Sequence, residues 1–506
     1  MAVTEHLEIE RKYDVGEEAE VPDLSGLPGV SSVSGPEEHE LAADYFDTPD
    51  LRLATAGVTL RRRTGGDDEG WHLKMPADGG RREVHVPLGQ AVKTPPVSLR
   101  RLVVAYTRRE SLALVVSLQT RRTARRLLAD DGAVLAEVCD DRVSADLPGW
   151  DAEPPVWREW EAELATGDPR LLDDVGALLA GAGALPSTHA SKLQRVLGSR
   201  VAVPPAAPSA SGGGPAVDVV LAYLHEQRAA FLRLDPALRS DDPEAVHDTR
   251  VALRRLRSVL ATYRRLFDRE AVAHLRGESS WLAGSLGTAR DAEVLRDHLR
   301  AALAAEPADM VPRSVAARLD DELSSALQEG NDAAQAVLDD ERYLDLLDEI
   351  DGFLDRPPLT ELARRPARSV VPKLVQRDWR RLRNVIGRAE SLPVGSVGRD
   401  EALHEIRKAA KRLRYAAEPA TPAFGKQPRR LARSAKQLQT VLGDHHDTVV
   451  ARDLLRRVGV EAHLAGDNAF TYGRLHGLFQ ARAEDLDRRW RSEWSHMPPP
   501  RTKHWG

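Results

Sequence analysis

Glu8-Ile9-Glu10-Arg11-Lys12, close to the start of the chain, alternates in a way that predicts a β-strand. Residues two apart in a strand lie on the same face, so Glu8, Glu10 and Lys12 would form one row, with Ile9 and Arg11 opposite. Two acids and a base make a poor hydrophobic core, but they suit the wall of a polar cavity that holds a metal ion and an anion. The alternative is a half-exposed edge strand, and these five residues alone do not decide between the two.

The first two hundred residues repeat this alternation. Short alternating segments are separated by turn residues such as Thr64-Gly65-Gly66 and Asp131-Gly132. The pattern is typical of an antiparallel sheet or barrel. We expect strands over 41–46, 58–63, 71–75, 82–88, 117–128, 134–141 and 156–164, and helices over 98–111 and 169–182.

Acidic and basic side chains share the predicted strand faces. A solvent-facing sheet could also be charged in this way, but a closed barrel with a polar lumen accounts for charges on strand after strand. Arginine and lysine bind phosphate oxygens, and carboxylates bind Mg²⁺ or Mn²⁺. The shared faces hold Arg61 and Arg63; His72 and Lys74; Arg81, Glu83 and His85; Glu137, Cys139 and Asp141; and Glu159, Glu161 and Glu163.

The second half of the chain is predicted to be helical. Residues 201–216 contain Gly212-Gly213-Gly214-Pro215 and no charge, which is typical of a linker. Asp242 and Pro243 then form an N-cap and first-turn pair, and an apolar stripe with helical spacing follows. We therefore expect domains over 1–200 and 217–495, a linker over 201–216 and a flexible tail over 496–506.

An internal repeat places basic residues at matching positions of two predicted helices. Each row lies beside the buried stripe rather than opposite it, so two facing helices would line a cationic groove. The alternative is that the aliphatic parts of these basic side chains cover the edge of the core while their charged groups reach solvent. The repeated spacing is shared by His247, Arg250, Arg254 and Arg257 in one copy and His404, Arg407, Lys411 and Arg414 in the other. A second matching motif follows later in each copy, at Leu286 to Asp291 and at Leu442 to Asp447.

Composition limits the class of protein. The chain of 506 residues is 42% apolar and 30% charged, has no run of eighteen apolar residues and no N-terminal signal segment. The single cysteine, Cys139, excludes an internal disulfide and fits a reducing cytosol. Residues 1–200 hold 24 Lys and Arg against 34 Asp and Glu, whereas residues 217–506 hold 48 against 44. An anion site in the second half must therefore come from local clustering.

The first two hundred residues resemble the CYTH domains, also called triphosphate tunnel metalloenzymes, whose ExExK signature matches Glu8 to Lys12. The resemblance implies an eight-stranded antiparallel tunnel with flanking helices. Members of that family hydrolyse inorganic tripolyphosphate, thiamine triphosphate or RNA 5′ ends, and some cyclise ATP. The other matching stretches are Tyr45-Phe46-Asp47-Thr48-Pro49, Leu60-Arg61-Arg62-Arg63, Trp71-His72-Leu73-Lys74, Thr120-Arg121-Arg122, Glu159-Trp160-Glu161-Ala162-Glu163 and Ser191-Lys192.

Carried over by position, the resemblance implies the site residues. A further metal ligand lies between residues 137 and 141, with Glu137 and Asp141 on one face. Around Arg81, a shift of the strand register by one residue would turn the inward-facing side chains outward. The implied metal ligands are Glu8, Glu10, Glu159 and Glu161; the phosphate-binding residues are Arg61, Arg63, Lys74, Arg81 and Arg122; the catalytic residues are Glu8, Glu10, Lys12 and Lys192.

The helical half resembles the CHAD domain, a conserved-histidine helical domain often fused to CYTH. The resemblance implies a bundle with two related halves that binds inorganic polyphosphate. A flexible polyanion without bases needs a charged groove and no stacking platform, and aromatic residues are only 5% of the chain. The implied polyphosphate-binding residues are His247, Arg250, Arg254, Arg257, His404, Arg407, Lys411 and Arg414.

We therefore expect a multidomain α+β protein that hydrolyses a triphosphate with Mg²⁺ or Mn²⁺ and captures inorganic polyphosphate. We expect it in the cytoplasm, associated with polyphosphate granules, and without membrane or nucleic-acid partners. One alternative is a non-catalytic polyphosphate-binding protein. The others are an adenylyl cyclase, which would form cyclic AMP, and nucleic-acid binding by the helical half.

Overall fold

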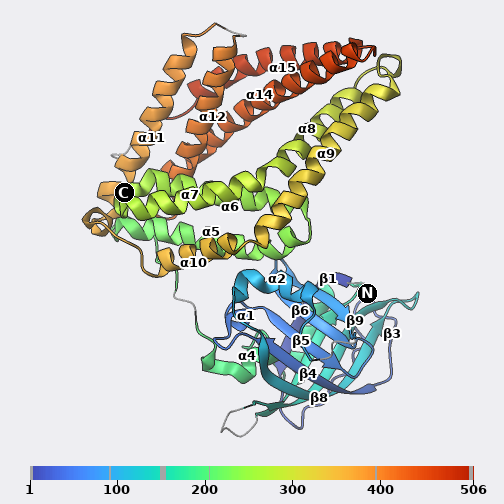
Figure 1. The fold of residues 1–506 in the computed structure, drawn as a ribbon. Helices are drawn as coiled ribbons and strands as arrows, with labels where there is room; N and C mark the ends of the chain where they lie inside the picture. The colour runs from blue at the N-terminus through green and yellow to red at the C-terminus, as the bar shows by residue number, and fades with distance from the viewer. Residues whose placement is uncertain are drawn as a thin grey trace. The chain divides into compact units, whose positions relative to one another are not determined.

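The computed structural model describes residues 4–89, 93–148, 155–203, 206–393, 396–500 and 505. The chain forms two compact units, Met1–Pro205 and Ala206–Gly506. The first is an antiparallel sheet with short helices, and the second is helical throughout its regular elements (Figure 1). The predicted α+β multidomain class is therefore confirmed.

The first unit contains all the strands of the described chain, and each predicted strand and helix overlaps an observed one. The short helices α1 and α4 were not predicted. The strands are β1 (Thr4–Glu8), β2 (Glu10–Asp14), β3 (Ser32–Val33), β4 (Glu37–Asp47), β5 (Thr59–Thr64), β6 (Gly70–Ala77), β7 (Gly80–Pro87), β8 (Ala113–Leu128), β9 (Val134–Asp146), β10 (Val156–Leu164) and β11 (Leu185–Pro186). The helices are α1 (Arg52–Thr55), α2 (Val97–Thr107), α3 (Arg170–Gly181) and α4 (Lys192–Leu197).

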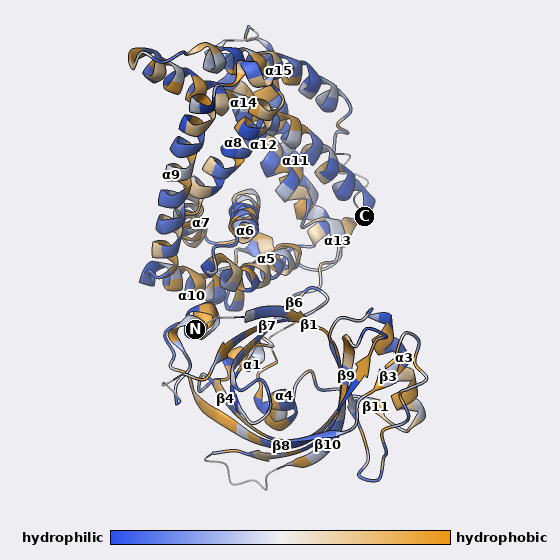
Figure 2. Ribbon diagram, turned by 90° about the vertical axis from the view of Figure 1, so that its right-hand side faces the viewer, coloured by the Kyte–Doolittle hydropathy of each residue, from blue (hydrophilic) through white to orange (hydrophobic). Residues whose placement is uncertain are grey.

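The sheet curls into a tunnel because the N-terminal segment pairs on both of its sides. β1 and β2 are successive halves of that segment, interrupted at Ile9. β1 pairs with β7, the strands β6, β5, β4, β8, β9 and β10 follow in order, and β10 pairs with β2. Figure 2 looks into the resulting ring of strands. With β1 and β2 counted as one, eight antiparallel strands surround the interior, as predicted; β3 and β11 are short additions.

Much of the apolar surface of the sheet faces outward. Val138 of β9 and Trp160 and Ala162 of β10 are buried against Leu172 and Val175 of α3. These strand residues alternate with Asp141, Glu159 and Glu161 in sequence, so the acids face the interior. The hydrophobic cluster outside the ring therefore stabilises strands whose inner face is charged.

One end of the interior is apolar. Val143 of β9 and Trp157 of β10 lie in the same rows as the inward acids, and they pack against Leu193 and Leu197 of α4. α4 is thereby fixed inside the end of the ring. Its first residue, Lys192, is held where the apolar section meets the charged one.

The second unit consists of long helices. Its elements are α5 (Ala216–Arg239), α6 (Pro243–Tyr263), α7 (Arg269–Ser285), α8 (Gly287–Ala304), α9 (Arg313–Leu338), α10 (Glu341–Asp355), α11 (Ala367–Glu390), α12 (Val397–Ala417), α13 (Thr421–Phe424), α14 (Lys426–Leu464) and α15 (Phe470–Ser495). Asp242 caps α6 as predicted, since its side chain accepts a hydrogen bond from the Glu244 backbone N–H.

The predicted repeat is visible in the helix order. α5, α6 and the pair α8–α9 in the first half correspond to α11, α12 and the pair α14–α15 in the second (Figure 1). α6 and α12 contact each other: Tyr263 donates a hydrogen bond to the Ala416 carbonyl at 2.7 Å, and Arg412 donates to the Ala261 carbonyl at 3.0 Å. The halves differ at the second motif, because a helix boundary lies at Leu286, whereas α14 runs unbroken through Leu442.

The two ends of the helical unit are fixed by contacts. At the start of α5, the Ala216 N–H donates to the Arg365 carbonyl, and the Ala367 N–H donates to the Gly214 carbonyl just before α5, each at 2.8 Å. In the predicted tail, Trp505 is buried and its ring centroid lies 5.7 Å from that of Phe424. The chain therefore packs on the helical unit at that position. Within the described residues, no helix combines the length and apolar character that crossing a bilayer requires.

Candidate functional site

The tunnel holds a charged cavity of about 50 Å³. This is room for one or two water molecules, because acidic and basic side chains pair across the lumen and fill it. Any larger ligand must displace those ion pairs. The lining residues are Glu8, Glu10, Lys12, Tyr45, Thr59, Arg61, Arg63, Lys74, Arg81, Arg122, Glu161, Glu163, Ser191 and Lys192.

Strand register places these side chains opposite one another. Glu10 is the cross-strand partner of Glu163, and Lys12 is the partner of Glu161. Directly opposed residues of antiparallel strands have neighbouring side chains on the same face. Inward positions on consecutive strands therefore bring residues far apart in the sequence into one layer around the lumen.

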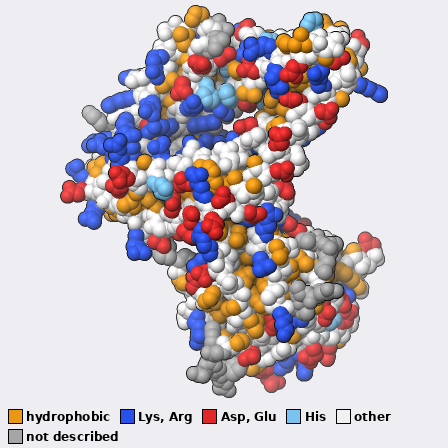
Figure 3. Space-filling view, in the orientation of Figure 1, with side chains coloured by type: hydrophobic (Ala, Val, Ile, Leu, Met, Phe, Trp, Pro, Cys, Tyr) orange, Lys and Arg blue, Asp and Glu red, His pale blue; other side chains and the backbone are white. Residues whose placement is uncertain are grey.

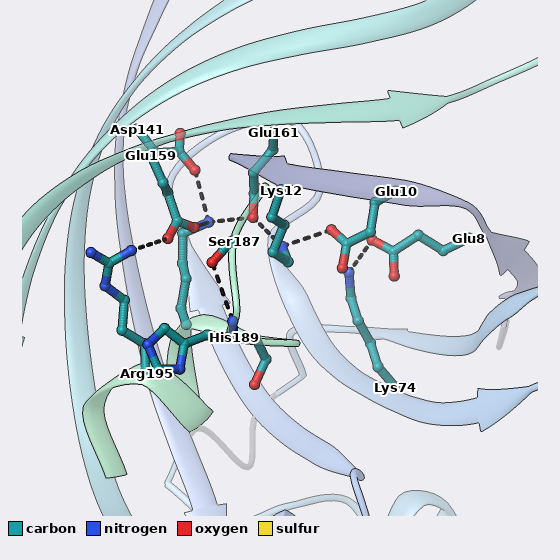
Figure 4. Close-up of polar contacts among 12 residues, drawn as sticks. Glu8, Glu10, Lys12, Lys74, Asp141, Glu159, Glu161, Ser187, His189 and Arg195 are labelled. Carbon is teal, nitrogen blue, oxygen red and sulfur yellow. Dashed lines mark hydrogen bonds and ion pairs between the residues drawn. The ribbon is translucent and has the colours of Figure 1, made fainter. Parts of the chain in front are cut away.

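Lys192 is the centre of the deeper acidic cluster. Its Nζ lies 2.9 Å from Asp141, 2.8 Å from Glu159 and 2.6 Å from Glu161. Figure 4 shows these three acids side by side. Burial by itself lowers the pKa of this amine, but the three carboxylates raise it well above its usual value. Their oxygens lie within 4.8 Å of one another, so this group could hold a metal ion. At present the ammonium group of Lys192 supplies that positive charge.

Two more cations compensate the same acids. Arg122 donates hydrogen bonds to both oxygens of Asp141, at 2.8 and 2.7 Å, and to Glu161 at 2.6 Å. Lys12 pairs with Glu161 and, at 2.8 Å, with Glu10. Although burial raises the pKa of Glu161, these cations and Lys192 hold it well below its usual range. The deeper part of the lumen is therefore neutralised by the protein itself.

The wall nearer β1 has less positive charge. Lys74 pairs with Glu8 and, at 3.3 Å, with Glu83, while one buried oxygen of Glu8, Oε2, has no hydrogen-bond partner among the described residues. Burial and the neighbouring Glu8 raise the pKa of Glu163 to about 7, and Glu10 adds to this repulsion. Such a shift marks a place where an additional cation would be stabilised.

The structure brings most of the predicted tunnel residues together. Arg81 lies on the lining, whereas Arg82 pairs with Glu5 outside the site, which fixes the inward register of β7. Of the two candidate acids on β9, Asp141 is in the buried cluster, and Glu137 instead contacts Arg126 at 3.3 Å. The roles of these residues stay predictions.

Some lining residues were not named as site residues from sequence. Glu163 was already in the inward row of its strand, so alternation was its signal; Glu83 shares the row of Arg81 and pairs with the lining residue Lys74 at 3.3 Å. Tyr45 accepts a hydrogen bond from Arg61 at 3.4 Å. By contrast, Asp47 of the same motif is fully buried and accepts hydrogen bonds from the backbone N–H groups of Leu53 and Ala54. Its place in the motif is explained by the fold of the turn.

Replacing Lys192 with Met should destabilise the first unit and make it respond to divalent cations. The change leaves three buried carboxylates short of a cation, which costs ~3–5 kcal/mol when a buried pair is broken. Thermal unfolding of Lys192→Met with EDTA, and then with Mg²⁺ or Mn²⁺, measures the loss and its partial recovery. The matched control is Lys93→Met, at an exposed position of the same unit. An unchanged transition temperature would contradict the stabilising role of Lys192.

The helical unit contains two cationic cavities. The larger, of about 1360 Å³, lies among α6, α7, α11 and α12, and the smaller, of about 500 Å³, lies among α6, α8, α12 and α14. Both are lined by Arg254, Arg407 and Lys411. Figure 3 shows Lys and Arg side chains gathered over the hollow between these helices.

The larger cavity has a strong excess of positive charge. Among its described lining residues Glu405 is the one carboxylate, and it pairs with Lys408 at 2.8 Å. Burial and adjacent cations lower the pKa values of Arg257 and Arg276. Basic groups whose pKa values are lowered by one another favour binding an anion. The other cationic lining residues are Arg254, Arg381, Arg383, Arg388, Arg407, Lys411 and Arg412.

The two copies of the repeat use their second motif alike. Arg250 donates to the Gly287 carbonyl at 3.1 Å and to Asp291 at 3.0 Å. In the second copy, Arg407 lies over Gly443, where an added Cβ would come within 3.5 Å of its Nε. In each copy the arginine therefore lies beside the glycine of the facing segment, at a distance where an added Cβ would make an ordinary van der Waals contact.

All but one of the positions predicted for polyphosphate binding line the two cavities of the helical unit. His247, Arg250, Arg254, Arg257, His404, Arg407 and Lys411 line one cavity or both. Arg414 is outside the described lining and instead donates to Glu418 at 2.7 Å. The arginines of α7 and α11 were missed, since nothing in the repeat indicates that those helices face α12.

Comparisons with known proteins agree with this architecture. A model of the CYTH domain matches residues 6–197, and a model of the CHAD domain matches residues 222–456. An uncharacterized protein of Mycobacterium tuberculosis (strain H37Rv) is 38% identical over 487 residues, which are 93% of this chain and 92% of that protein. A protein of strain CDC 1551 / Oshkosh matches with the same values.

Among solved structures, PptA from Streptomyces chartreusis is similar with a TM-score of 0.48 and 21% sequence identity. The alignment covers 56% of this chain and 99% of that one. The two domain matches follow one another along the chain, and the mycobacterial relatives extend over both. The chain therefore belongs to the family of proteins that join an N-terminal CYTH domain to a C-terminal CHAD domain.

Proposed function

We propose that the tunnel hydrolyses a phosphoric anhydride bond of inorganic tripolyphosphate or a related triphosphate, with Mg²⁺ or Mn²⁺. The observation that carries this proposal is a lumen lined by arginines, lysines and carboxylates together. A site for a simple anion needs only cations. Carboxylates beside them are required when a metal ion must be held together with the phosphate.

The acids on the β1 side of the lumen have fewer cationic partners than Asp141, Glu159 and Glu161, whose oxygens already lie within 4.8 Å of one another around Lys192. Glu8 has an unpartnered buried oxygen, and Glu10 and Glu163 are cross-strand partners beside it. Asp141, Glu159 and Glu161 already surround Lys192. We therefore assign metal binding to Glu8, Glu10 and Glu163, with oxygen ligands that Mg²⁺ and Mn²⁺ prefer. When bound, the ion supplies charge neutralisation and activation of water.

The basic residues of the lumen would hold the phosphate chain. Arg61, Arg63 and Arg122 present guanidinium groups that can bind phosphate oxygens in pairs, and Lys74 adds a single charge. Lys12 and Lys192 keep the deeper carboxylates ionised. On entry, phosphate oxygens would replace the carboxylates as partners of these cations, so the positive charges are placed before the substrate arrives.

The direct test is release of inorganic phosphate from tripolyphosphate. We expect release with Mg²⁺ or Mn²⁺, none after the metal is removed with EDTA, and recovery when the metal is restored. A panel with ATP and thiamine triphosphate measures the preference, and appearance of cyclic AMP from ATP would identify a cyclase instead. Intact metal-dependent binding of tripolyphosphate without any phosphate release would contradict the hydrolase and favour a binding protein.

For the helical unit we propose binding of inorganic polyphosphate along the two cavities. Their shared cations, Arg254, Arg407 and Lys411, would connect the cavities into one path for a long polyanion. The described lining has no Trp, Tyr or Phe on which nucleic acid bases could stack. Competition of polyphosphate against single-stranded RNA across a salt series tests this choice, and RNA that displaces polyphosphate at equal charge would contradict it.

Polyphosphate binding should weaken as pH rises through neutrality. Burial and the nearby Arg407, Arg254 and Arg250 lower the pKa of Lys411 to about 7, whereas that of His404 is lowered to about 4. A bound polyanion stabilises the charged amine, so binding takes up a proton above pH 7. Between pH 6 and pH 8 we expect affinity to fall about tenfold. Calorimetry in buffers of different ionisation heat measures the uptake, and Lys411→Arg should flatten the profile.

A further inference from the structure

Lys411 is placed unusually for a lysine. It lies on α12 at the boundary of the two cationic cavities and lines both. The structure gives its amine no ion pair or hydrogen bond with any described residue. Lys408, one turn earlier, lines the larger cavity as well, but its amine pairs with Glu405 at 2.8 Å and is more than half exposed.

The charged groups around Lys411 are mainly cationic, with carboxylates contributed by α14 and α8. α6 contributes arginines, α14 contributes one carboxylate and a histidine, and α8 contributes groups farther along the smaller cavity. A lysine amine that is partly desolvated among other cations is stabilised in its neutral form. The facing groups are Arg250 and Arg254 on α6; His404 and Arg407 on α12; His446 and Asp447 on α14; and Arg290, Asp291 and His298 on α8.

A neutral amine in this position is a nucleophile at physiological pH. The pKa of about 7 means that about half of the Lys411 side chains are unprotonated at pH 7, whereas an ordinary lysine is almost wholly charged. The surrounding arginines attract small anions from solution. The two properties together favour electrophiles that carry their own negative charge.

We propose that Lys411 is a site of covalent acylation by small acyl phosphates. The cavity at Lys411 concentrates the anionic reagent, and the unpaired amine attacks it. This proposal goes beyond hydrolysis in the tunnel and does not rest on polyphosphate binding.

The reaction balances without an additional reagent. The lone pair of Lys411 Nζ forms a bond to the carbonyl carbon of the acyl phosphate, and the bond between that carbon and the phosphate oxygen breaks. The phosphate leaves with the electron pair of that bond, and the proton lost from the amine passes to it. The products are an amide at Lys411 and inorganic phosphate, and no atom changes oxidation state. The amide has no positive charge, so the modification would also remove a cation from the shared path.

The experiment uses the full chain with acetyl phosphate at pH 7.5, followed by peptide mass spectrometry over time. We expect Lys411 to be acetylated about tenfold or more faster than Lys408, because of its larger fraction of neutral amine. A neutral N-hydroxysuccinimide acetate is the comparison reagent. The preference for Lys411 should be larger with acetyl phosphate than with the neutral ester, because only the phosphate is attracted by the arginines.

Two variants separate the causes. Lys411→Arg should lose the fast-labelled peptide while the labelling of Lys408 stays the same. Arg254→Gln keeps the lysine but removes a neighbouring cation, so acetylation of Lys411 should slow at pH 7.5 and recover at higher pH. Equal labelling of Lys411 and Lys408 by both reagents would overturn the proposal. A preference seen only with the neutral ester would overturn the assignment to acyl phosphates.

Discussion

Replacing Glu10 with Gln should lower phosphate release from tripolyphosphate by about 10²–10³-fold, which is the size of effect expected when a group that organises transition-state charge is removed. The amide keeps the shape of the side chain but loses its charge. Glu10 stands beside Glu8 and opposite Glu163, so the change weakens the wall that fits a metal ion. It also removes one of the two acidic partners of Lys12.

The measurement is a full titration of phosphate release against metal concentration. A ligand role predicts that a larger concentration of Mn²⁺ or Mg²⁺ recovers part of the lost rate. The matched control is Glu40→Gln on β4, whose side chain is exposed and pairs with Arg121 outside the lumen. Polyphosphate capture by the helical unit should be unchanged in both variants. If Glu10→Gln reduced release and capture together, our division of the two activities between the two units would be wrong.

Alternation was sufficient to predict most of the tunnel because strand geometry is local. Once residues two apart share a face, Glu159, Glu161 and Glu163 must all face the side opposite Trp160 and Ala162. Burial of those two residues against α3 then fixes which side is inward. A shift by one residue would place these acids in the apolar cluster against α3 and Trp160 in the charged lumen, so the hydrophobic effect selects the register.

Contacts between strands, and contacts made through a helix, could not be predicted from alternation in the sequence. The sequence left Glu137 and Asp141 equivalent, because both lie in one row of β9. The pairing of β8 with β9 sets Asp141 opposite Arg122 and Glu137 opposite Arg126, and α4 then brings Lys192 against Asp141. That helix has only six residues; Ser191 caps its start, and packing of Leu193 and Leu197 stabilises it in place.

In the helical unit the sequence predicted the basic rows but not all their partners. The spacing of Arg250, Arg254 and Arg257 follows from one helix, whereas the contribution of Arg276 and Arg388 depends on how α7 and α11 pack beside α12. Arg414 has the repeated spacing, yet it pairs with Glu418, one turn later on its own helix. A carboxylate at that spacing was the local indication that this arginine is already neutralised.

Replacing both Arg254 and Arg407 with Ala should weaken polyphosphate binding by about a hundredfold or more. Both arginines line the two cavities, and each charge-assisted contact contributes about 1.5–3 kcal/mol. The buried Nε of Arg407 has no hydrogen-bond partner in the described chain, so little in the fold competes for it. Arg254 makes a 3.3 Å hydrogen bond to the hydroxyl of Tyr415, which the alanine variant loses. Thermal unfolding of each variant measures that structural cost separately.

The salt dependence of binding distinguishes a direct role from a general loss of charge. If both arginines contact phosphates, the slope of log affinity against log salt should fall in magnitude by about one to two. The control is the double variant Arg456→Ala and Arg488→Ala, which removes the same charge from exposed positions of α14 and α15. It should leave both slope and affinity nearly unchanged. Equal weakening by the two double variants would mean that net charge, and not the path shared by the cavities, determines polyphosphate binding.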